Sequence, residues 1–376
     1  MKTFQSRWTA GAGWTPALGG GLSRAQLVLV FGGGRTLEEA SRLAELREAF
    51  PEARVFGCST AGEILDTTVS DDTIAVTAVE FERTFLRGTR VRVGDPAESF
   101  SAGRRLSESL PGEGLTHVLV LSDGLGVNGS ELVKGLTSAL PAGVTVTGGL
   151  SGDGARFERT SVVWDGAAER GTVAAVGLYG DGLRVGYASL GGWDPFGPER
   201  LITRSKGNVL YELDGQSALD LYKKYLGAHA SGLPATGLLF PLSLRANGAD
   251  TGVVRTILSV DEKEKSMTFA GDVPEGALAR LMKANFDRLI DGASGAAQKC
   301  RDGRADAELA LLISCVGRKM VLKQRVEEEV EGVRDVLGAG PALTGFYSYG
   351  EISPFTPSAR CELHNQTMTI TTLSER

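Results

Sequence analysis

Short apolar runs that end in glycine recur along the chain and alternate with helical patterns. The run AQLVLVFGGG (25–34) precedes an amphipathic segment, TLEEASRLAELREAF (36–50), and a second apolar run that leads into GCSTAGEI (57–64). The same order recurs in HVLVLSDGLG, GSELVKGLTSAL and VTVTGGLSGDG (117–154), and in AELALLISCVGR, QRVEEEVEGVRDVLG and ALTGFYSYGEI (307–352). Such runs predict strand, helix and strand. We therefore expect three β-α-β units with parallel strands and right-handed connections.

Two other stretches alternate between apolar and polar residues, which predicts antiparallel strands. These are residues 73–93 and 160–193, and DG and GDG turn signals interrupt the second. The expected fold class is α/β, or mixed α+β, with parallel and antiparallel pairing in the same sheets. A change of composition over residues 202–232 predicts a domain boundary near residue 213, which divides the chain into domains 1–213 and 214–376.

One turn occurs twice. GCSTAGEI (57–64) and GFYSYGEI (345–352) share the first glycine, a hydroxyl residue and the closing Gly-Glu-Ile. This similarity predicts two domains related by an approximate internal duplication and a two-fold axis. The two turns would then face each other across one crevice at the carboxyl ends of equivalent strands, where α/β proteins commonly bind ligands.

Composition and charge narrow the classes of function. The chain has 376 residues, of which 42% are hydrophobic, and a net charge of −6. Without a basic cluster interleaved with aromatic residues, neither a nucleic-acid partner nor a membrane surface is expected. The four cysteines form no CxxC pair, and the N-terminal residues contain no apolar signal segment, which together predict a cytoplasmic protein with free thiols.

Three motifs resemble parts of enzyme sites but are incomplete. Ser59 lies in a GxSxxG pattern rather than the GxSxG of a nucleophile elbow, and the chain has only three histidines that could act as a base. The GxGxxG at residues 124–129 follows Asp123, a carboxylate that would repel a pyrophosphate. Cys58 and Cys315 are expected to be small buried thiols. We therefore predict no enzymatic activity, no catalytic residues and no metal site.

Polar residues gather in the glycine-rich turns that follow the predicted strands, and these turns are the candidate ligand pocket. Carboxylates, hydroxyls and free backbone amides could hold the ammonium and carboxylate of an amino acid, and two tyrosines would add aromatic walls. The candidate ligand-binding residues are Ser59, Thr60, Gly62, Glu63, Asp123, Ser151, Asp153, Tyr347, Tyr349, Glu351, His364 and Asn365.

Several of these motifs, in this order, resemble the FIST family with its tandem FIST-N and FIST-C domains. The residues that carry the resemblance are GCSTAGEI, GGLSGDG, GNVLYELDG, FPLSLR, SCVGR, GFYSYGEISP and LHNQTMT. The resemblance implies an intracellular sensor that binds a small molecule, with amino acids favoured, and that signals to a separate effector such as a kinase or cyclase. It implies no conserved catalytic machinery. With only three histidines in the chain, we also predict no obligatory cofactor. The alternative that the resemblance leaves open is a haem-based sensor of nitric oxide that uses His364 as the axial ligand, and a purely structural role is a third reading.

Overall fold

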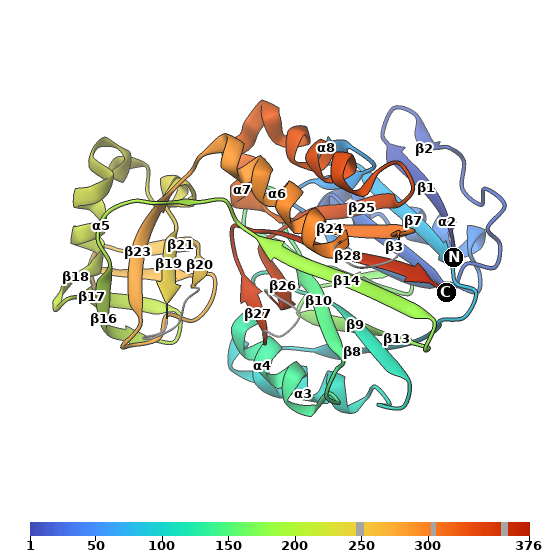
Figure 1. The fold of residues 1–376 in the computed structure, drawn as a ribbon, viewed down its shortest axis with the longest axis horizontal. Helices are drawn as coiled ribbons and strands as arrows, with labels where there is room; N and C mark the ends of the chain where they lie inside the picture. The colour runs from blue at the N-terminus through green and yellow to red at the C-terminus, as the bar shows by residue number, and fades with distance from the viewer. Residues whose placement is uncertain (246–251, 302–305, 355–359) are drawn as a thin grey trace.

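A computed structural model describes residues 1–245, 252–301, 306–354 and 360–376. Helices and strands combine in sheets that mix parallel and antiparallel pairs, so the predicted fold class is confirmed (Figure 1). Three sheets make up the larger part of the molecule, and a fourth forms a smaller part that stands to one side of it.

Each of the three sheets is built mainly from one unit of the chain, and the three units have the same order of elements. In each unit, the two strands on either side of the main helix pair in parallel. The first unit contains β1 (Lys2–Thr9), β3 (Leu27–Gly32), α2 (Ala40–Ala49), β4 (Arg54–Ser59), β5 (Glu63–Leu65), β6 (Thr68–Ser70) and β7 (Ile74–Glu80). The second contains β8 (Phe85–Arg92), β9 (Leu115–Ser122), α4 (Gly129–Ala139), β10 (Thr145–Leu150), β11 (Val162–Trp164), β12 (Ala167–Glu169) and β13 (Thr172–Tyr179). The third contains β14 (Leu183–Leu190), β24 (Leu309–Cys315), α8 (Val326–Leu337), β25 (Ala342–Ser348), β26 (Gly350–Pro354), β27 (Cys361–His364) and β28 (Met368–Glu375).

The units exchange their short hairpins in a cycle. The β5–β6 hairpin of the first unit pairs with β25 of the third, the β26–β27 hairpin of the third pairs with β10 of the second, and the β11–β12 hairpin of the second pairs with β4 of the first. The three sheets therefore have matching strand orders, and each contains strands from two units. The expected two-fold relation between the first and third units is wrong, because the second unit is an equal member of a three-membered cycle.

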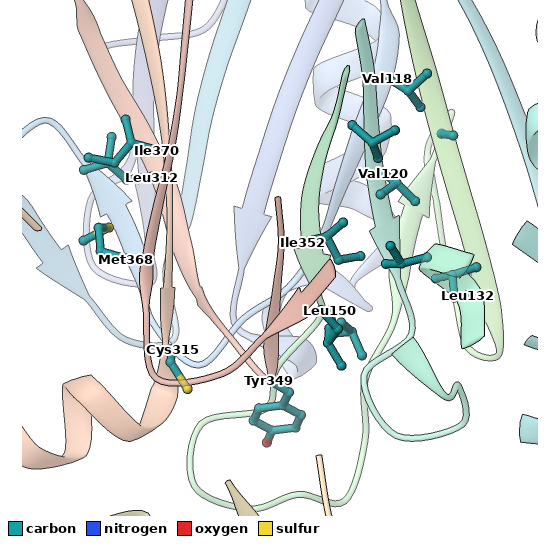
Figure 2. Close-up of a cluster of buried hydrophobic side chains, with 14 of the residues drawn as sticks. Val118, Val120, Leu132, Leu150, Leu312, Cys315, Tyr349, Ile352, Met368 and Ile370 are labelled. Atoms are coloured by element: carbon teal, nitrogen blue, oxygen red, sulfur yellow. The ribbon is translucent and has the colours of Figure 1, made fainter. Parts of the chain in front are cut away.

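Helices cover the outer faces of the second and third sheets in pairs. α3 (Ser99–Glu108) packs against α4, and α6 (Phe286–Arg301) packs against α8. The helix pattern expected over residues 36–50 is divided between α1 (Gly34–Leu37) and α2. One large apolar core joins the second and third units. Figure 2 shows Leu150 and Ile352 of this core close together, with Val118 and Val120 farther along β9 and Leu132 of α4 to one side.

The fourth sheet forms a separate part, residues 193–285, which we call the barrel insert. Its main elements are β16 (Arg200–Lys206), β17 (Val209–Leu213), α5 (Ala218–Leu226), β19 (Leu242–Arg245), β20 (Val253–Arg255), β21 (Ile257–Asp261), β22 (Ser266–Phe269) and β23 (Leu278–Lys283). β20 and β21 stand at the two ends of the sheet order, yet they are consecutive segments interrupted only at Thr256. The sheet thus curls until its two end strands meet at Thr256, and it encloses its own apolar core.

The insert separates β14 from the rest of the third unit. β14 pairs with β28 although the insert lies between them in the chain, so the third sheet is completed only by residues on both sides of it. Leu213, where we placed the domain boundary, ends β17 inside the insert. The boundary between domains 1–213 and 214–376 stays a prediction.

Candidate functional site

The turns that follow the second parallel strand of each unit meet and bond to one another. Their backbones form a ring of three hydrogen bonds: Ala61 N to Tyr347 O (2.8 Å), Tyr349 N to Leu150 O (3.2 Å) and Gly152 N to Ser59 O (2.9 Å). Each bond joins one unit to the next in the same cyclic order as the hairpins. The repeated turn is therefore the place where the three units are held together.

A glycine lies at the equivalent position of each of these strands because the neighbouring strand comes too close for a side chain. A Cβ atom on Gly57, Gly148 or Gly345 would lie 1.7–1.8 Å from the carbonyl oxygen of the paired strand. Real Cβ atoms do not approach this closely, so each position requires glycine.

Glu63 and Glu351 make the same set of hydrogen bonds in their turns. Glu63 accepts from the Thr60 hydroxyl (2.5 Å) and from the amide (3.0 Å) and hydroxyl (2.7 Å) of Thr73. Glu351 accepts from the Ser348 hydroxyl (2.7 Å) and from the amide (3.1 Å) and hydroxyl (2.9 Å) of Thr367. Each glutamate thus ties its turn to the start of the next long strand.

Both glutamates are almost completely buried, and this changes their acidity. Burial disfavours the carboxylate and raises the pKa of Glu63 to about 7 and the pKa of Glu351 to about 8, although the hydrogen bonds that each glutamate accepts act in the opposite direction. The two side chains therefore gain protons at a higher pH than an exposed glutamate.

A cleft of about 470 Å³ opens beside the first of these turns, and we call it the junction cleft because all three units line it. The first unit supplies Gly33, Thr60, Ala61, Gly62, Glu63, Asp71 and Asp72, the second supplies Gly154, Ala155 and Arg156, and the third supplies Val316, Lys319, Met320 and Lys323. Its volume lies within the range typical of small-molecule sites.

The charged side chains of the junction cleft are divided by sign between the units. The carboxylates of Glu63, Asp71 and Asp72 come from the first unit, whereas the cations come from the second and third. Lys319 donates to Ala61 O (2.9 Å) and forms an ion pair with Asp71. Gly62 makes room for it, because a Cβ there would lie 2.4 Å from the Lys319 Nζ atom.

The two other cations differ in how firmly they are held. The guanidinium of Arg156 donates twice to Asp153 Oδ1 (2.6 and 2.9 Å), and these bonds raise its pKa. Lys323 follows the end of α7 (Val316–Leu322) and is exposed. No hydrogen bond of its side chain to the first unit occurs among the described residues.

Three of the predicted site residues, Thr60, Gly62 and Glu63, line the junction cleft, and Asp153 holds Arg156 at its border. The other eight lie outside its lining: Ser59, Asp123, Ser151, Tyr347, Tyr349, Glu351, His364 and Asn365. The sequence predicts one cavity that Thr60 and Glu63 share with Ser59, Tyr347, Tyr349, Glu351, His364 and Asn365. The last six do not border this cleft.

Most of these eight side chains make internal hydrogen bonds instead. Asp123 accepts from the amides of its own loop, at Leu125 (2.9 Å) and Gly126 (2.7 Å). The Ser59 hydroxyl accepts from Ser161 N (2.9 Å), and that of Ser151 donates to Ser122 O (2.9 Å). Polar residues in a glycine-rich turn satisfy the turn's own backbone first, and a single sequence does not reveal which of them remain available.

The two tyrosines and the two residues near the C-terminus are also held within the fold. Tyr349 stacks on Phe157 with ring centroids 4.4 Å apart, and its hydroxyl donates to Gly154 O (3.1 Å). The Tyr347 hydroxyl donates to Glu329 Oε1 (2.6 Å), and the Asn365 amide donates to Tyr349 O (3.4 Å).

His364, the candidate haem ligand, is buried. Its Nε2 atom lies 2.8 Å from Ser353 O, and burial lowers its pKa to about 4. The ring does not face the junction cleft, and an axial bond from Nε2 would require this contact to break. These contacts do not fit haem ligation by His364. Whether haem binds stays untested, as does our expectation that it is not obligatory.

Sequence reasoning missed the cations of the cleft. Lys319 directly follows the SCVGR motif. A positive charge just after this strand of the third unit is the sequence feature that could have indicated it. Arg156 was not singled out, although it follows the GGLSGDG turn. Sequence reasoning also missed the buried ion pair between Arg318 of α7 and Glu329 of α8, in which Arg318 Nη2 lies 2.6 Å from Glu329 Oε2.

The described ranges, 1–245, 252–301, 306–354 and 360–376, hold neither a metal-type cluster nor a spanning helix. Within them, no group of three or more histidine, cysteine, aspartate or glutamate side chains is arranged to hold a metal ion. No helix in the same ranges is both long and apolar enough to cross a membrane.

Comparison with known families places the chain. Residues 26–216 match the FIST N domain and residues 218–354 match the FIST C domain. The chain belongs to the FIST family. FIST domains are associated with the sensing of small ligands in signal transduction, and the resemblance read from the sequence motifs is confirmed.

Individual relatives add little. The chain is 25% identical over 224 residues to an uncharacterized protein, MJ1623, of Methanocaldococcus jannaschii, a match that covers 55% of this chain and 41% of the relative. The chain thus matches about two fifths of that relative's length. A cyanuric acid hydrolase from A. caulinodans aligns over 100% of this chain and 98% of its own, with 12% identity and a TM-score of 0.35.

Proposed function

We propose that this FIST protein is a non-enzymatic sensor that binds a small zwitterionic molecule, with an amino acid favoured, in the junction cleft. The observation that carries the proposal is the separation of charge across the cleft. Carboxylates of the first unit stand against Arg156, Lys319 and Lys323 of the other two units. An amino acid carries an ammonium group for the first side and a carboxylate for the second, and charge-assisted hydrogen bonds are stronger than neutral ones.

The roles follow from how firmly each group is already bound. Lys323 is exposed and outside the internal ion pairs, so it is the cation best able to take the ligand carboxylate. Asp72, which adjoins the Lys319 partner Asp71, is the corresponding acceptor for the ammonium group. The signal would pass to a separate effector, such as a kinase or cyclase.

A hydrolytic role is disfavoured by the comparison of the two turns. Thr60 and Glu63 form a hydroxyl–carboxylate pair in the cleft, which has the appearance of a nucleophile with its base. The same pair recurs as Ser348 and Glu351, where neither residue lines the cleft. Because the hydroxyl–carboxylate pair also occurs away from the cleft, its role in holding the turn together is enough to explain it.

Isothermal titration of the purified protein with each of the protein amino acids tests the proposal. We expect one chemical group of amino acids to bind, and Lys323→Ala to weaken that binding about tenfold, because a charge-assisted hydrogen bond contributes roughly 1.5–3 kcal/mol. Lys263→Ala, which removes an exposed lysine of the barrel insert, is the matched control. Absence of binding by every amino acid, or equal affinity in Lys323→Ala, would overturn the proposal.

A further inference from the structure

The short helix α7 stands between the junction cleft and the barrel insert. On one side, Val316, Lys319 and Met320 line the cleft. On the other, Val321 and Leu322 pack in a small apolar cluster with Trp193, Met282 and Leu289. Trp193 and Met282 belong to the insert, and Leu289 belongs to α6, which follows it. One helix of seven residues thus contacts both parts of the molecule.

Arg318, also on α7, holds both chain segments that connect the insert to the rest of the protein. Its guanidinium is fully buried and donates to Gly191 O (2.5 Å), just before the insert, and to Leu289 O (2.7 Å), just after it. Glu329 fixes the same guanidinium through Nε (2.9 Å) and Nη2 (2.6 Å). A movement of α7 would therefore pull on both connections at once.

The same network reaches back toward the cleft. Glu329 Oε1 accepts from the Tyr347 hydroxyl (2.6 Å), and the Lys319 Nζ atom lies 5.6 Å from the centre of the Tyr347 ring. Lys319 in turn bonds to Ala61 O and Asp71 of the first unit. A continuous set of contacts therefore runs from the cleft carboxylates to the connections of the insert.

Polar contacts also join the described residues of the insert to the larger part. Arg255 donates to Leu363 O (2.9 Å), and Asp272 pairs with Lys134 (2.9 Å) on α4. Gln366 donates to Leu238 O (3.3 Å) in the insert. A part with its own core and two connecting segments can move as a rigid body relative to the rest of the molecule.

We propose that the barrel insert is the output arm of the sensor, and that α7 transmits occupancy of the junction cleft to it through Lys319 and Arg318. A ligand held by Lys323 and Asp72 that also draws Lys319 away from Ala61 O and Asp71 releases α7 from the first unit. The helix then changes its hold on Gly191 and Leu289, and the insert changes position. Coupling of this kind is reciprocal, so fixing the insert also changes ligand affinity. This inference rests on the proposed function.

Trp193 provides a reporter inside the connection. Its indole nitrogen donates to Gln366 O (2.8 Å) and its ring packs against α7. With Trp8, Trp14 and Trp164 replaced by phenylalanine, all tryptophan emission comes from this site. The experiment measures that emission together with amide hydrogen exchange over residues 235–239 and 285–289. The perturbations are an equimolar mixture of the protein amino acids and, without any ligand, the substitution Lys319→Met.

We expect Lys319→Met to shift the Trp193 emission and to raise hydrogen exchange at both segments several-fold. Lys263→Met, which removes an exposed lysine of the barrel insert outside the cleft lining, should change neither. Unchanged emission and exchange in Lys319→Met would overturn the coupling. This arm needs no ligand, so it decides the coupling even if no amino acid binds and the proposed function fails.

The amino-acid mixture supplies the second arm. We expect it to protect residues 60–73 and to shift the Trp193 signal in the parent protein. Protection of residues 60–73 from hydrogen exchange with no change at residues 285–289 would overturn the coupling but would still support the binding site. Val321→Ala trims the contact with Trp193 without altering a charged cleft residue, so it should keep the protection of residues 60–73 and lose at least half of the response at residues 285–289.

Discussion

At the scale of single residues, the repeated turn is a device for joining units. Gly57, Gly148 and Gly345 let neighbouring backbones approach, and Glu63 and Glu351 tie their turns to the next strand. The second unit keeps the strand glycine, Gly148. It has Asp153-Gly154 at the positions where the other two units have Gly-Glu, and Asp153 binds Arg156. Only one of the two glutamates lines the cleft. The recurrence of Gly-Glu-Ile is therefore explained by its structural role in the turn rather than by ligand binding.

Replacement of a strand glycine tests this requirement directly. In Gly345→Ala the new Cβ would lie 1.8 Å from Leu312 O, so two paired strands must separate. We expect a loss of about 2–4 kcal/mol in the free energy of unfolding, measured by urea titration. Gly11→Ala, where nothing lies within 4 Å of the new atom, should change it by less than about 0.5 kcal/mol. Equal midpoints for the two variants would contradict the packing argument.

Glu351 predicts a pH dependence of stability. Its pKa is about 8 in the folded protein, above the ordinary value of 4.5, so the folded state binds this proton more tightly than the unfolded state. The resulting stabilisation is complete below about pH 4.5 and is lost as the pH rises to about 8. Glu351→Gln cannot ionise, so its stability should fall less steeply across this window, by up to about 1.4 kcal/mol per pH unit.

Urea unfolding at a series of pH values measures this difference. Glu362→Gln, which changes an exposed carboxylate close in sequence, should retain the pH profile of the parent protein. Parallel profiles for the parent protein and Glu351→Gln would show that the buried carboxyl does not titrate in this range.

At the scale of elements, the sequence predicted the strands and helices that a continuous stretch of residues specifies. β3, β9 and β24 each contain an apolar run, and a helix begins within a few residues of the end of each strand, so all three parallel pairs could be predicted. The exchanged hairpins could not. β5 has three residues, and its partner β25 lies almost three hundred positions away, so no local pattern records the pairing. The cleft was missed in part for the same reason, since its cations lie opposite the first turn only after this exchange.

α7 shows how one element can carry a buried charge. Arg318 and Glu329 are both fully buried, and each would be left uncompensated without the other. We expect Glu329→Gln to lower the free energy of unfolding by about 3–5 kcal/mol, the usual result of breaking a buried ion pair. Arg325→Met, which removes a half-exposed ion pair with Glu328, should cost less than about 1 kcal/mol. Thermal and urea unfolding compare the two variants. A similar small loss in both would mean that the interior around Arg318 is hydrated.

At the scale of the whole molecule, cyclic exchange makes the three units one cooperative body. Every sheet of the larger part contains strands from two units, and the third sheet needs residues from both sides of the barrel insert. The insert, by contrast, has a curled sheet and a core of its own. The physical division of the chain is therefore between the three-unit body and the insert that interrupts its third unit.

Two deletions distinguish this division from a simple cut of the chain. A fragment of residues 1–213 lacks β24, β25 and β28, so β5 loses its pairing with β25, β14 loses its pairing with β28, and the ring of turns loses one member. We expect this fragment to aggregate or to lack a cooperative unfolding transition. Removal of residues 193–285 with a short glycine-serine linker in their place should leave a folded body, because Gly191 O and Leu289 O already converge on the guanidinium of Arg318. Circular dichroism and thermal melting compare the two proteins. A cooperatively folded 1–213 fragment would show that the first two units hold together without the third and that the cycle is not required for stability.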